Sequence, residues 1–486
     1  LREGKETADE RSLQGITWED IGVDMLVVDE AHHFKNLGVP VASADLGMQV
    51  SASAKCEDLL DKCRYMRDEG NGSRIVFETG PPVSNSLSEL YNMQRYLAPG
   101  LLEAQGISVF ASWAASFGTV APSVELKPDG SGFQVKQRFS KFCNLPELMQ
   151  SVHQFADVIT NADLSLDVPD VDVVPVPVPI SPAQRECVQE LVARADAIRA
   201  GGVAPEDDNM LNVTTDGRKI AIDPKLLLDH AGDPPLEDGK VAACAARVHA
   251  IWEAEASRRG TQLVFCDTST PSGRGWNVYD DLRRRLVDLG VDPAEIAFVH
   301  DAGDNVDKRE QLFERVRNGE VRVLLGSTAK LGTGTNVQSR LCAIHDLDCP
   351  WRPADLEQRL GRIVRQGNSY DRVKAFRYVT EGTFDAYSYQ TVERKQRFIA
   401  QVITSKSPAR EASDLDEVVL DYASLKALAT GDPTIQERMR LENDLAQLKL
   451  LRSAYASQVA SIRHDIECKL EPRARMFRES RDTARD

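Results

Sequence analysis

Two carboxylates follow an apolar run near the start of the chain, in the stretch 24-DMLVVDEAHHFKNL-37. The run predicts a buried strand that delivers Asp29 and Glu30 to its carboxyl end. There Asp29 can hold Mg²⁺, while Glu30 can share the metal and deprotonate an attacking water, as nucleotide hydrolysis requires. The alternative is an acidic strand end in solvent. The apolar residues before the pair and the Ala-His after it favour the catalytic interpretation.

A second candidate group has the spacing Gln358-x-x-Gly361-Arg362-x-x-Arg365. Residues three apart lie on one face of a helix, so two guanidiniums can reach across one cleft. A planar guanidinium suits the neutralisation of charge that grows on a γ-phosphate in the transition state. We therefore predict Arg362 and Arg365 as catalytic residues; the alternative is a solvated basic face of a helix.

A third group is the glycine-rich stretch 326-GSTAKLGTGTNVQ-338. Glycines let a phosphodiester or a nucleotide approach the backbone, while hydroxyl and amide groups donate to phosphate oxygens. An ordinary strand-to-helix turn would use the same residue types, so this stretch alone is weak evidence. The sequence contains no G-x-x-x-x-G-K-[ST] stretch, the loop that cradles phosphates in many nucleotide-binding proteins.

The composition restricts the class of protein. With 486 residues the chain can build two or three domains with ordinary cores. The net charge of −16 argues against a basic coat over the whole surface, but residues 351–410 hold 12 Lys and Arg against 6 Asp and Glu. A local basic track of this kind is compatible with nucleic-acid binding. No apolar run approaches the ~20 residues that cross a bilayer, so no membrane association is expected.

The nine cysteines are scattered, and no two of them form a C-x-x-C pair. This pattern disfavours a disulfide framework or a zinc site and favours a reducing, cytoplasmic location. His32 and His33 are adjacent rather than at the spacing of helical metal ligands, so a metal site at that pair is disfavoured as well.

The hydrophobic pattern predicts two regions in which strands and helices alternate, as in α/β domains with parallel sheets. The first has strands over 24–28 and 73–80 and helices over 51–70 and 87–97. The second has strands over 261–267, 295–300, 321–327 and 342–348, and helices over 276–290, 307–319 and 356–367.

The segments between and after these regions have other patterns. Residues 121–171 are rich in loop signals, and a domain boundary is expected near 150–170. The alternating valines and prolines of 171–184 indicate an edge strand or a linker. Residues 182–240 predict helices followed by polar loops. From about 431 onward apolar residues recur close to every 3.5 positions, which predicts a long helix, either in a coiled coil or in a hairpin that caps the preceding domain.

In chain order, these motifs resemble those of the superfamily-two helicases of the Swi/Snf type. LVVDEAHHFKN resembles motif II, and ETGPPVSNSLSELYNMQRYLAPG (78–100) resembles motif III, with Pro81 where the family has threonine. QLVFCD resembles motif IV, GSTAKLGTGTNVQ resembles motif V, and HDLDCPWRPADLEQRLGRIVRQGN (345–368) resembles motif VI. The missing threonine hydroxyl lies in the segment that couples the nucleotide site to DNA.

The resemblance implies an α/β fold of two RecA-like lobes with parallel sheets, the first incomplete. Residues 1–150 would form the rear part of lobe one. Residues 166–410 would form lobe two, with a mostly helical insertion at about 182–255, and residues 411–486 a helical tail. The cofactors implied are ATP and Mg²⁺, and the partner implied is DNA, contacted mainly through its backbone.

The resemblance also implies roles for single residues. In addition to Asp29, Glu30, Arg362 and Arg365, the nucleotide would be contacted by His32, Gly332, Gly334 and Gln358. Nucleic acid would be contacted by Ser84, Asn85, Ser327, Thr328, Asn336 and Trp351.

Within that branch the sequence is most similar to the helicase halves of large methyltransferase–helicase proteins of phages and conjugative elements. This similarity implies a fragment that lacks its phosphate-binding loop and has little ATPase activity alone. It also implies an upstream methyltransferase and the rest of lobe one as partners, and a helix partner for the tail. One alternative is a non-catalytic nucleic-acid-binding module. Another is an RNA-directed DEAH helicase, against which Asn85 and the Trp351-x-Pro353 spacing argue.

Overall fold

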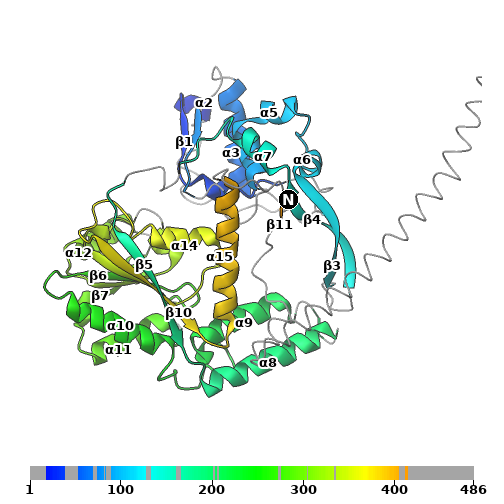
Figure 1. Ribbon diagram of the computed structural model, residues 1–486. Coiled ribbons are helices and arrows are strands. Elements are labelled where there is room, and N and C mark those ends of the chain that lie inside the picture. Colours follow the sequence, from blue (N-terminus) through cyan, green and yellow to red (C-terminus); the bar gives the residue numbers. More distant parts are fainter. Residues whose placement is uncertain are drawn as a thin grey trace, which may run out of the picture.

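The computed structural model describes residues 18–38, 53–68, 74–80, 83, 89–126, 133–159, 166–200, 203–204, 207–271, 275–303, 305–332, 335–403 and 411–413. Figure 1 shows two bodies: the first body is formed before residue 160 and the second body after residue 165. Helix α15 (Phe384–Ile403) runs from the second body to the first, where it meets α7 (Leu145–Val152).

The first body is built around two short parallel strands, β1 (Leu26–Val28) and β2 (Ile75–Phe77), with Val27 opposite Val76. The elements around them are α2 (Trp18–Ile21), η1 (Ala31–Phe34), α3 (Ala54–Asp68), α4 (Glu89–Leu97), α5 (Pro99–Ala104) and α6 (Phe110–Phe117). One apolar cluster joins β1, η1, α3 and α4, and its members include Val28, Ala31, Cys56, Leu60, Cys63 and Tyr96. The strands and helices predicted in this region are confirmed, with somewhat shorter bounds. The prediction that the strand before Asp29 is buried was wrong, because within β1 only Val28 is buried and Val27 is 50% exposed.

A long antiparallel hairpin follows, in a region where the sequence predicted loops. Strands β3 (Gly118–Leu126) and β4 (Phe133–Cys143) pair along their lengths, and β11 (Glu411–Ser413) adds to β4. The loop prediction gave too much weight to Pro122 and to the PDG sequence. Because β3 is an edge strand, a proline without an N–H is tolerated there, and the PDG sequence belongs to the connection between the strands.

The second body contains a six-stranded parallel sheet with the order β5-β10-β9-β6-β8-β7. Its strands are β5 (Asp170–Val178), β6 (Thr261–Phe265), β7 (Ile296–Phe298), β8 (Val323–Gly326), β9 (Leu341–Asp346) and β10 (Arg372–Thr380). The valine–proline stretch forms the edge strand β5, as expected. β10, which lies between β5 and β9, was not predicted, although Val373 and Ala375 alternate with Arg372 and Lys374 as in a strand.

Helices pack against this sheet and connect its strands (Figure 1). They are α10 (Lys240–Ala254), α11 (Val278–Asp288), α12 (Val306–Arg317), α13 (Thr328–Gly332) and α14 (Pro353–Leu360), with short 3-10 turns η3 (Pro224–Leu226), η4 (Pro293–Glu295), η5 (Val299–Ala302) and η6 (Gln338–Arg340). Asn277 caps α11 by accepting a hydrogen bond from the Asp280 N–H. The helix predicted over 356–367 was wrong in its bounds: α14 begins at Pro353 and ends at Leu360.

Two helices precede α10 and pack on one another: α8 (Pro182–Arg199) and α9 (Met210–Ile222). Ser181 and Gln184 form a reciprocal capping box at the start of α8. The helical stretches predicted between 182 and 255 are thus confirmed. The helical tail predicted after residue 411 falls almost entirely outside the described residues. Among the described helices, none is long and apolar enough to cross a bilayer.

Candidate functional site

The acidic pair lies where β1 turns into η1. Glu30 adopts the left-handed conformation, with φ 51° and ψ 44°, and its backbone N–H donates to Asp29 Oδ1 over 2.8 Å. A left-handed non-glycine residue is uncommon and costs on the order of 1 kcal/mol, so the surrounding contacts must hold it. The Asp29 side chain is exposed, whereas the Glu30 side chain is 28% exposed and half-buried.

Helix α4 supplies the contacts that hold this turn. Lys35 Nζ lies 2.7 Å from Glu89 Oε1, Asn92 Nδ2 donates to Lys35 O over 2.8 Å, and Tyr96 OH donates to Phe34 O over 3.1 Å. The turn is also tied to β2, because the Ala31 N–H donates to Glu78 O over 3.0 Å. The residues after the acidic pair therefore have little freedom to move relative to α4 and β2.

His32 connects the turn to both bodies. Its Nδ1 lies 2.9 Å from Thr79 Oγ1 and 3.3 Å from Glu30 Oε2, and its Nε2 lies 3.5 Å from Gln358 Nε2 on α14. Burial, helped by nearby His33 and Lys35, lowers the pKa of His32 to about 4. The ring is therefore neutral near pH 7, so its 3.3 Å contact with Glu30 is not an ion pair.

A cavity of about 500 Å³ opens between the two bodies at this point. The first body contributes Glu30, His32 and His33 to its wall. The second body contributes the carboxyl end of β6, the start of α13 and one side of α14, through Asp267, Thr270, Ser327, Thr328, Ala329, Arg352, Ala354, Asp355 and Gln358. Acidic, basic and hydroxyl groups from segments more than 200 residues apart thus face one space.

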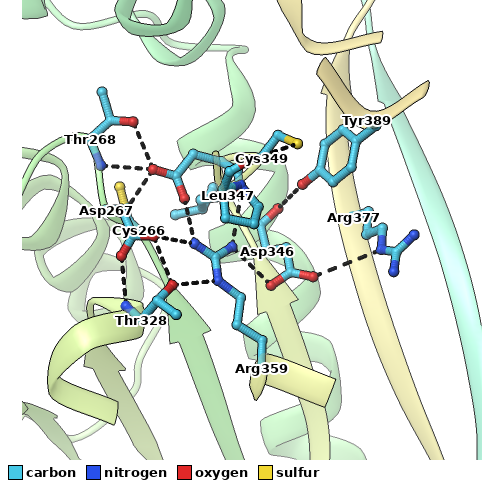
Figure 2. A network of polar contacts seen from close by, with 12 residues as sticks. Cys266, Asp267, Thr268, Thr328, Asp346, Leu347, Cys349, Arg359, Arg377 and Tyr389 are labelled. Carbon is cyan, nitrogen blue, oxygen red and sulfur yellow. Dashed lines mark hydrogen bonds and ion pairs between the residues drawn. The ribbon is translucent and has the colours of Figure 1, made fainter. Parts of the chain in front are cut away.

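A buried arginine holds the second-body wall together (Figure 2). Arg359 is 1% exposed, and Figure 2 shows its guanidinium between the carboxylates of Asp267 and Asp346, beside Thr328. Nη2 lies 2.7 Å from Asp267 Oδ2 and 3.1 Å from Asp348 Oδ1, and Nη1 lies 3.1 Å from Asp346 Oδ1. Nε donates to Thr328 Oγ1 over 2.8 Å. The guanidinium therefore ties the ends of β6 and β9 to α13 and α14.

The charges in this network influence one another. Burial raises the pKa of Asp346 above its ordinary range, although Arg359 and Arg377 act in the opposite direction. Burial also acts to raise the pKa of Asp348, but Arg359 and Arg218 outweigh it and the pKa is lowered. Asp348 accepts hydrogen bonds from the N–H groups of Asp267 and Thr268 over 2.8 and 2.7 Å, which stabilise its ionised form.

The two predicted arginines follow α14 and do not lie within it. Arg362 and Arg365 nevertheless converge, because Nη1 of each donates to Thr335 O, over 3.3 and 3.2 Å. Burial lowers the pKa of Arg362, Arg365 lowers it further, and the negative charge of Glu30 raises it. Arg362 and Glu30 therefore lie close enough across the cleft for their charges to interact.

Five of the predicted site residues line the cleft, and others do not. Glu30, His32, Ser327, Thr328 and Gln358 line it. The Thr328 hydroxyl is already engaged, since it donates to Asp267 and accepts from Arg359. Outside the lining are Asp29, Asn336, Trp351 and the two predicted arginines, Arg362 and Arg365. The Arg218 guanidinium lies 4.0 Å from the Trp351 ring centroid, and Gly332 is the last residue of α13. Ser84, Asn85, Gly334 and Pro81 lie outside the described residues.

Several residues of the site were not predicted from the sequence. Arg359 stands beside the predicted Gln358, and a clue to it was available: Asp267, Asp346 and Asp348 follow apolar strands, and buried carboxylates require a cation. Thr79 belongs to the quoted motif, but only the structure shows its contact with His32. Arg352 and Asp355 carried no signal beyond their charge. Burial raises the pKa of Asp355, and nearby Arg352 opposes this.

Comparisons with known proteins give two family matches. Residues 1–160 match a model described as a probable helicase domain, and residues 246–367 match the helicase conserved C-terminal domain. The chain is 19% identical to Defense against restriction protein B of Escherichia phage P1, over 86% of this chain and 24% of that protein. It is 22% identical to Protein CHROMATIN REMODELING 4 of Arabidopsis thaliana, over 83% of this chain and 16% of that protein. The chain thus spans less than a quarter of the length of either relative.

Solved structures with a related arrangement include the C-terminal part of the Fun30 ATPase domain, with a TM-score of 0.38 and 13% identity. That match covers 56% of this chain and 99% of the Fun30 chain. Another is the Sulfolobus solfataricus SWI2/SNF2 ATPase core in complex with dsDNA, with a TM-score of 0.35 and 17% identity, covering 81% of this chain and 70% of that one.

Proposed function

We propose that this chain, which belongs to the superfamily-two helicases of the Swi/Snf type, is the carboxy-terminal portion of an ATP-driven DNA translocase. The observation that carries the proposal is the cavity of about 500 Å³ between the two bodies. One wall holds the carboxylate of Glu30, and the other holds donors from α13 and α14.

The residues of this cavity fit a magnesium nucleotide. Its volume lies within the ~300–1,000 Å³ typical of small-molecule sites. Arg352, Gln358 and the Ser327 hydroxyl offer donors to anionic oxygens. The carboxylates of Asp29 and Glu30, neither of them paired with a lysine or an arginine in the described part of the chain, offer the hard oxygen ligands that Mg²⁺ prefers. When bound, Mg²⁺ would supply charge neutralisation at the phosphates.

Glu30 is the residue placed to accept a proton from the attacking water. Its backbone is fixed by the left-handed turn and its carboxylate is held beside neutral His32, so the carboxylate does not depend on a cation to stay in position. Arg362 and Arg365 both donate to the same neutral carbonyl, Thr335 O. A carbonyl oxygen carries no net charge, whereas a phosphate oxygen pairs the guanidinium with an anion and can accept a bidentate contact. Exchange of the carbonyl for a phosphate oxygen is therefore favourable.

Movement of the second body as a unit follows from the Arg359 network. Because that network ties β6, β9, α13 and α14 together, a pull on Arg362 would displace the whole wall. We propose that this displacement advances the protein along one DNA strand. Support for a nucleic-acid partner comes from the family and from the excess of basic residues between 351 and 410. Contacts to the DNA backbone would make binding sensitive to salt.

The relative in phage P1 is named for defence against restriction. We propose by similarity that the whole protein acts on incoming phage or mobile-element DNA, with a methyltransferase as part of the same protein.

ATP hydrolysis by the 486-residue chain is the first test. No G-x-x-x-x-G-K-[ST] sequence is present to hold the phosphates, so we expect turnover near background with or without duplex DNA. Robust turnover that Glu30→Gln abolishes would refute this expectation of inactivity while supporting the motor assignment.

Nucleotide binding tests the cleft itself. A fluorescent ATP analogue with Mg²⁺ should bind saturably, and Arg362→Ala should weaken its binding about tenfold, the loss of one charge-assisted contact. Arg185→Ala, which removes an exposed arginine of α8, is the matched control and should leave binding unchanged. No binding, or equal binding by both variants, combined with salt-sensitive DNA binding would identify a non-catalytic DNA-binding module instead.

A further inference from the structure

Three side chains with metal-ligating atoms meet on the second body, and none of them lines the cleft. Cys187 and Glu190 lie one turn apart on α8, and His230 lies in the loop after η3. Cys187 Sγ is 3.5 Å from His230 Nε2, and Glu190 Oε2 is 3.7 Å from the same nitrogen. All three ligand atoms lie within 4.8 Å of one another.

These separations match the edges of a tetrahedral metal site. With a Zn–S bond of ~2.3 Å and Zn–N and Zn–O bonds of ~2.0–2.1 Å, tetrahedral geometry places sulfur and nitrogen about 3.6 Å apart and nitrogen and oxygen about 3.4 Å apart. The observed S···N distance of 3.5 Å needs almost no adjustment, and the observed O···N distance of 3.7 Å needs a few tenths of an ångström. Glu190 is exposed on a helix surface and can supply that shift by rotation of its side chain.

The histidine is already oriented for coordination. His230 Nδ1 lies 2.8 Å from Asp233 Oδ2, a contact that favours a proton on Nδ1, and Nε2 faces Cys187 and Glu190. Asp233 and Glu190 raise the pKa of His230, so a cation at Nε2 would compete with a proton there. A carboxylate on the far nitrogen of a ligating histidine is the usual outer contact of protein zinc sites. The loop is also fixed by its own backbone, because the Asp233 N–H donates to His230 O over 3.0 Å.

The electrostatic surroundings favour a cation. Burial raises the pKa of the Cys187 thiol to about 11, and the negative charges of Glu190, Glu186 and Asp233 add to this effect. Three carboxylates that act on one thiol give a local field that a divalent cation would neutralise.

A nucleophilic Cys–His–Asp triad would use the same three residue types and must be weighed against the metal. The Cys187 side chain is 1% exposed, and the cavity between the two bodies is lined by other residues. A buried thiol that is protonated at neutral pH has neither access to a substrate nor thiolate character. The geometry favours coordination over nucleophilic chemistry.

We propose that Cys187, Glu190 and His230 bind one divalent transition-metal cation of the zinc class, with a water as fourth ligand. Binding forms a sulfur–metal bond and releases the thiol proton to solvent, one proton for each ion. The metal cross-links the loop that contains His230 to α8 through its protein ligands. Cys187 belongs to an apolar cluster with Cys349 and Leu356, so the cross-link stabilises the packing beneath the approach to α14.

The test uses the full chain, freed of metal with a chelator and then titrated with Co²⁺. We expect one equivalent to produce a near-ultraviolet thiolate-to-cobalt band that Zn²⁺ removes by competition. Cys187→Ser should abolish that band, and Cys143→Ser should retain it, since Cys143 donates only to a backbone carbonyl. Circular dichroism confirms that each variant is folded.

Two further variants separate coordination from structural effects. Asp233→Asn should keep the band while weakening cobalt affinity about tenfold, as loss of an outer contact does. His249→Gln is its matched control, because His249 pairs with the single carboxylate of Glu253 at 3.8 Å and should leave affinity unchanged.

Alkylation of Cys187 distinguishes a metal ligand from a nucleophile. Because its thiol is buried, Cys187 should resist iodoacetamide at neutral pH with or without Zn²⁺, as followed by mass spectrometry. The proposal is overturned if the cobalt band is absent or survives in Cys187→Ser. It is equally overturned if Cys187 is alkylated rapidly at neutral pH, regardless of Zn²⁺, and His230→Gln removes that reactivity, since this pattern identifies a nucleophile.

Discussion

Arg359 is the residue whose removal most directly tests how the cleft wall is built. All five N–H bonds of its guanidinium are used: one by Thr328, two by Asp348, one by Asp346 and one by Asp267, over 2.7 to 3.1 Å. The side chain is fully buried. Arg359→Met keeps a similar apolar volume but leaves the carboxylates of Asp346 and Asp348, each 4% exposed, without this partner.

The expected cost is a balance of two terms. Five hydrogen bonds to mostly charged acceptors, at roughly 1.5–3 kcal/mol each, would sum to about 10 kcal/mol. Part of this loss, several kcal/mol, is offset in the variant. The folded state no longer has the cost of desolvating a guanidinium, and a buried carboxylate can become neutral by taking up a proton. We therefore expect the free energy of unfolding of the second body to fall by about 3–5 kcal/mol, the usual cost of breaking a buried ion pair.

Urea unfolding followed by circular dichroism measures this loss, with Arg284→Met as control. Arg284 also pairs with two carboxylates, but it is 54% exposed, and Asp281 keeps Arg285 at 2.8 Å. The control should lose less than about 1 kcal/mol.

The pH dependence distinguishes loss of the ion pair from loss of packing. Without the guanidinium the folded-state pKa values of the two carboxyls rise above their unfolded values, so the deficit should shrink as the pH falls from 7 to 5. A loss no larger than that of Arg284→Met, or a deficit independent of pH, would refute the reasoning.

Three shorter predictions follow from other residues. Burial lowers the pKa of His345 to about 3, so its ring stays neutral in the fold while the unfolded chain takes up a proton below about pH 6.5. The contribution of the neutral His345 ring to the free energy of unfolding is complete above pH 6.5. This contribution decreases as the pH falls, by about 2 kcal/mol at pH 5. His345→Gln should therefore flatten the pH dependence of urea unfolding between pH 7 and 5, and an unchanged slope would contradict this. A Cβ at Gly326 would lie 2.6 Å from Leu331 Cγ, so Gly326→Ala should lower the unfolding free energy by about 1–3 kcal/mol. Gly232→Ala, with nothing within 4 Å of its new carbon, is the control and should stay within about 0.5 kcal/mol; equal losses would show that Leu331 moves aside freely. Finally, chelator treatment should lower the melting temperature of the metal-loaded wild-type chain and leave that of Cys187→Ser unchanged, and an equal response by both would place the metal elsewhere.

The sequence predicted most of the parallel-sheet elements, because buried strands such as β6 and β8 are uninterrupted apolar runs followed by turn residues. It missed β10, whose apolar and charged residues alternate as in a strand, and it took turn residues for loops, as between β3 and β4. The helix predicted to carry Arg362 and Arg365 ends at Leu360, and the two arginines converge through Thr335 O, a contact that spacing does not reveal.

The candidate site was predictable wherever one motif supplies its residues, as with Asp29 and Glu30. It was not predictable where partners are far apart in sequence. The hydrogen bond of His32 to Thr79 spans 47 residues, and the Cys187–His230 pair spans 43. The absence of C-x-x-C spacing disfavoured a zinc site, yet ligands assembled from a helix and a later loop need no such spacing.

The central claim is that one nucleotide lies between the first body and the second body, with Glu30 and Arg362 on opposite sides of it. A crystal structure of the chain with Mg²⁺ and a non-hydrolysable ATP analogue measures this directly. We predict the triphosphate in the cavity between Glu30 and Gln358, with the Arg362 guanidinium moved from Thr335 O to a phosphate oxygen. A nucleotide bound outside that cavity, or one bound there with Arg362 still on Thr335 O, would contradict the account.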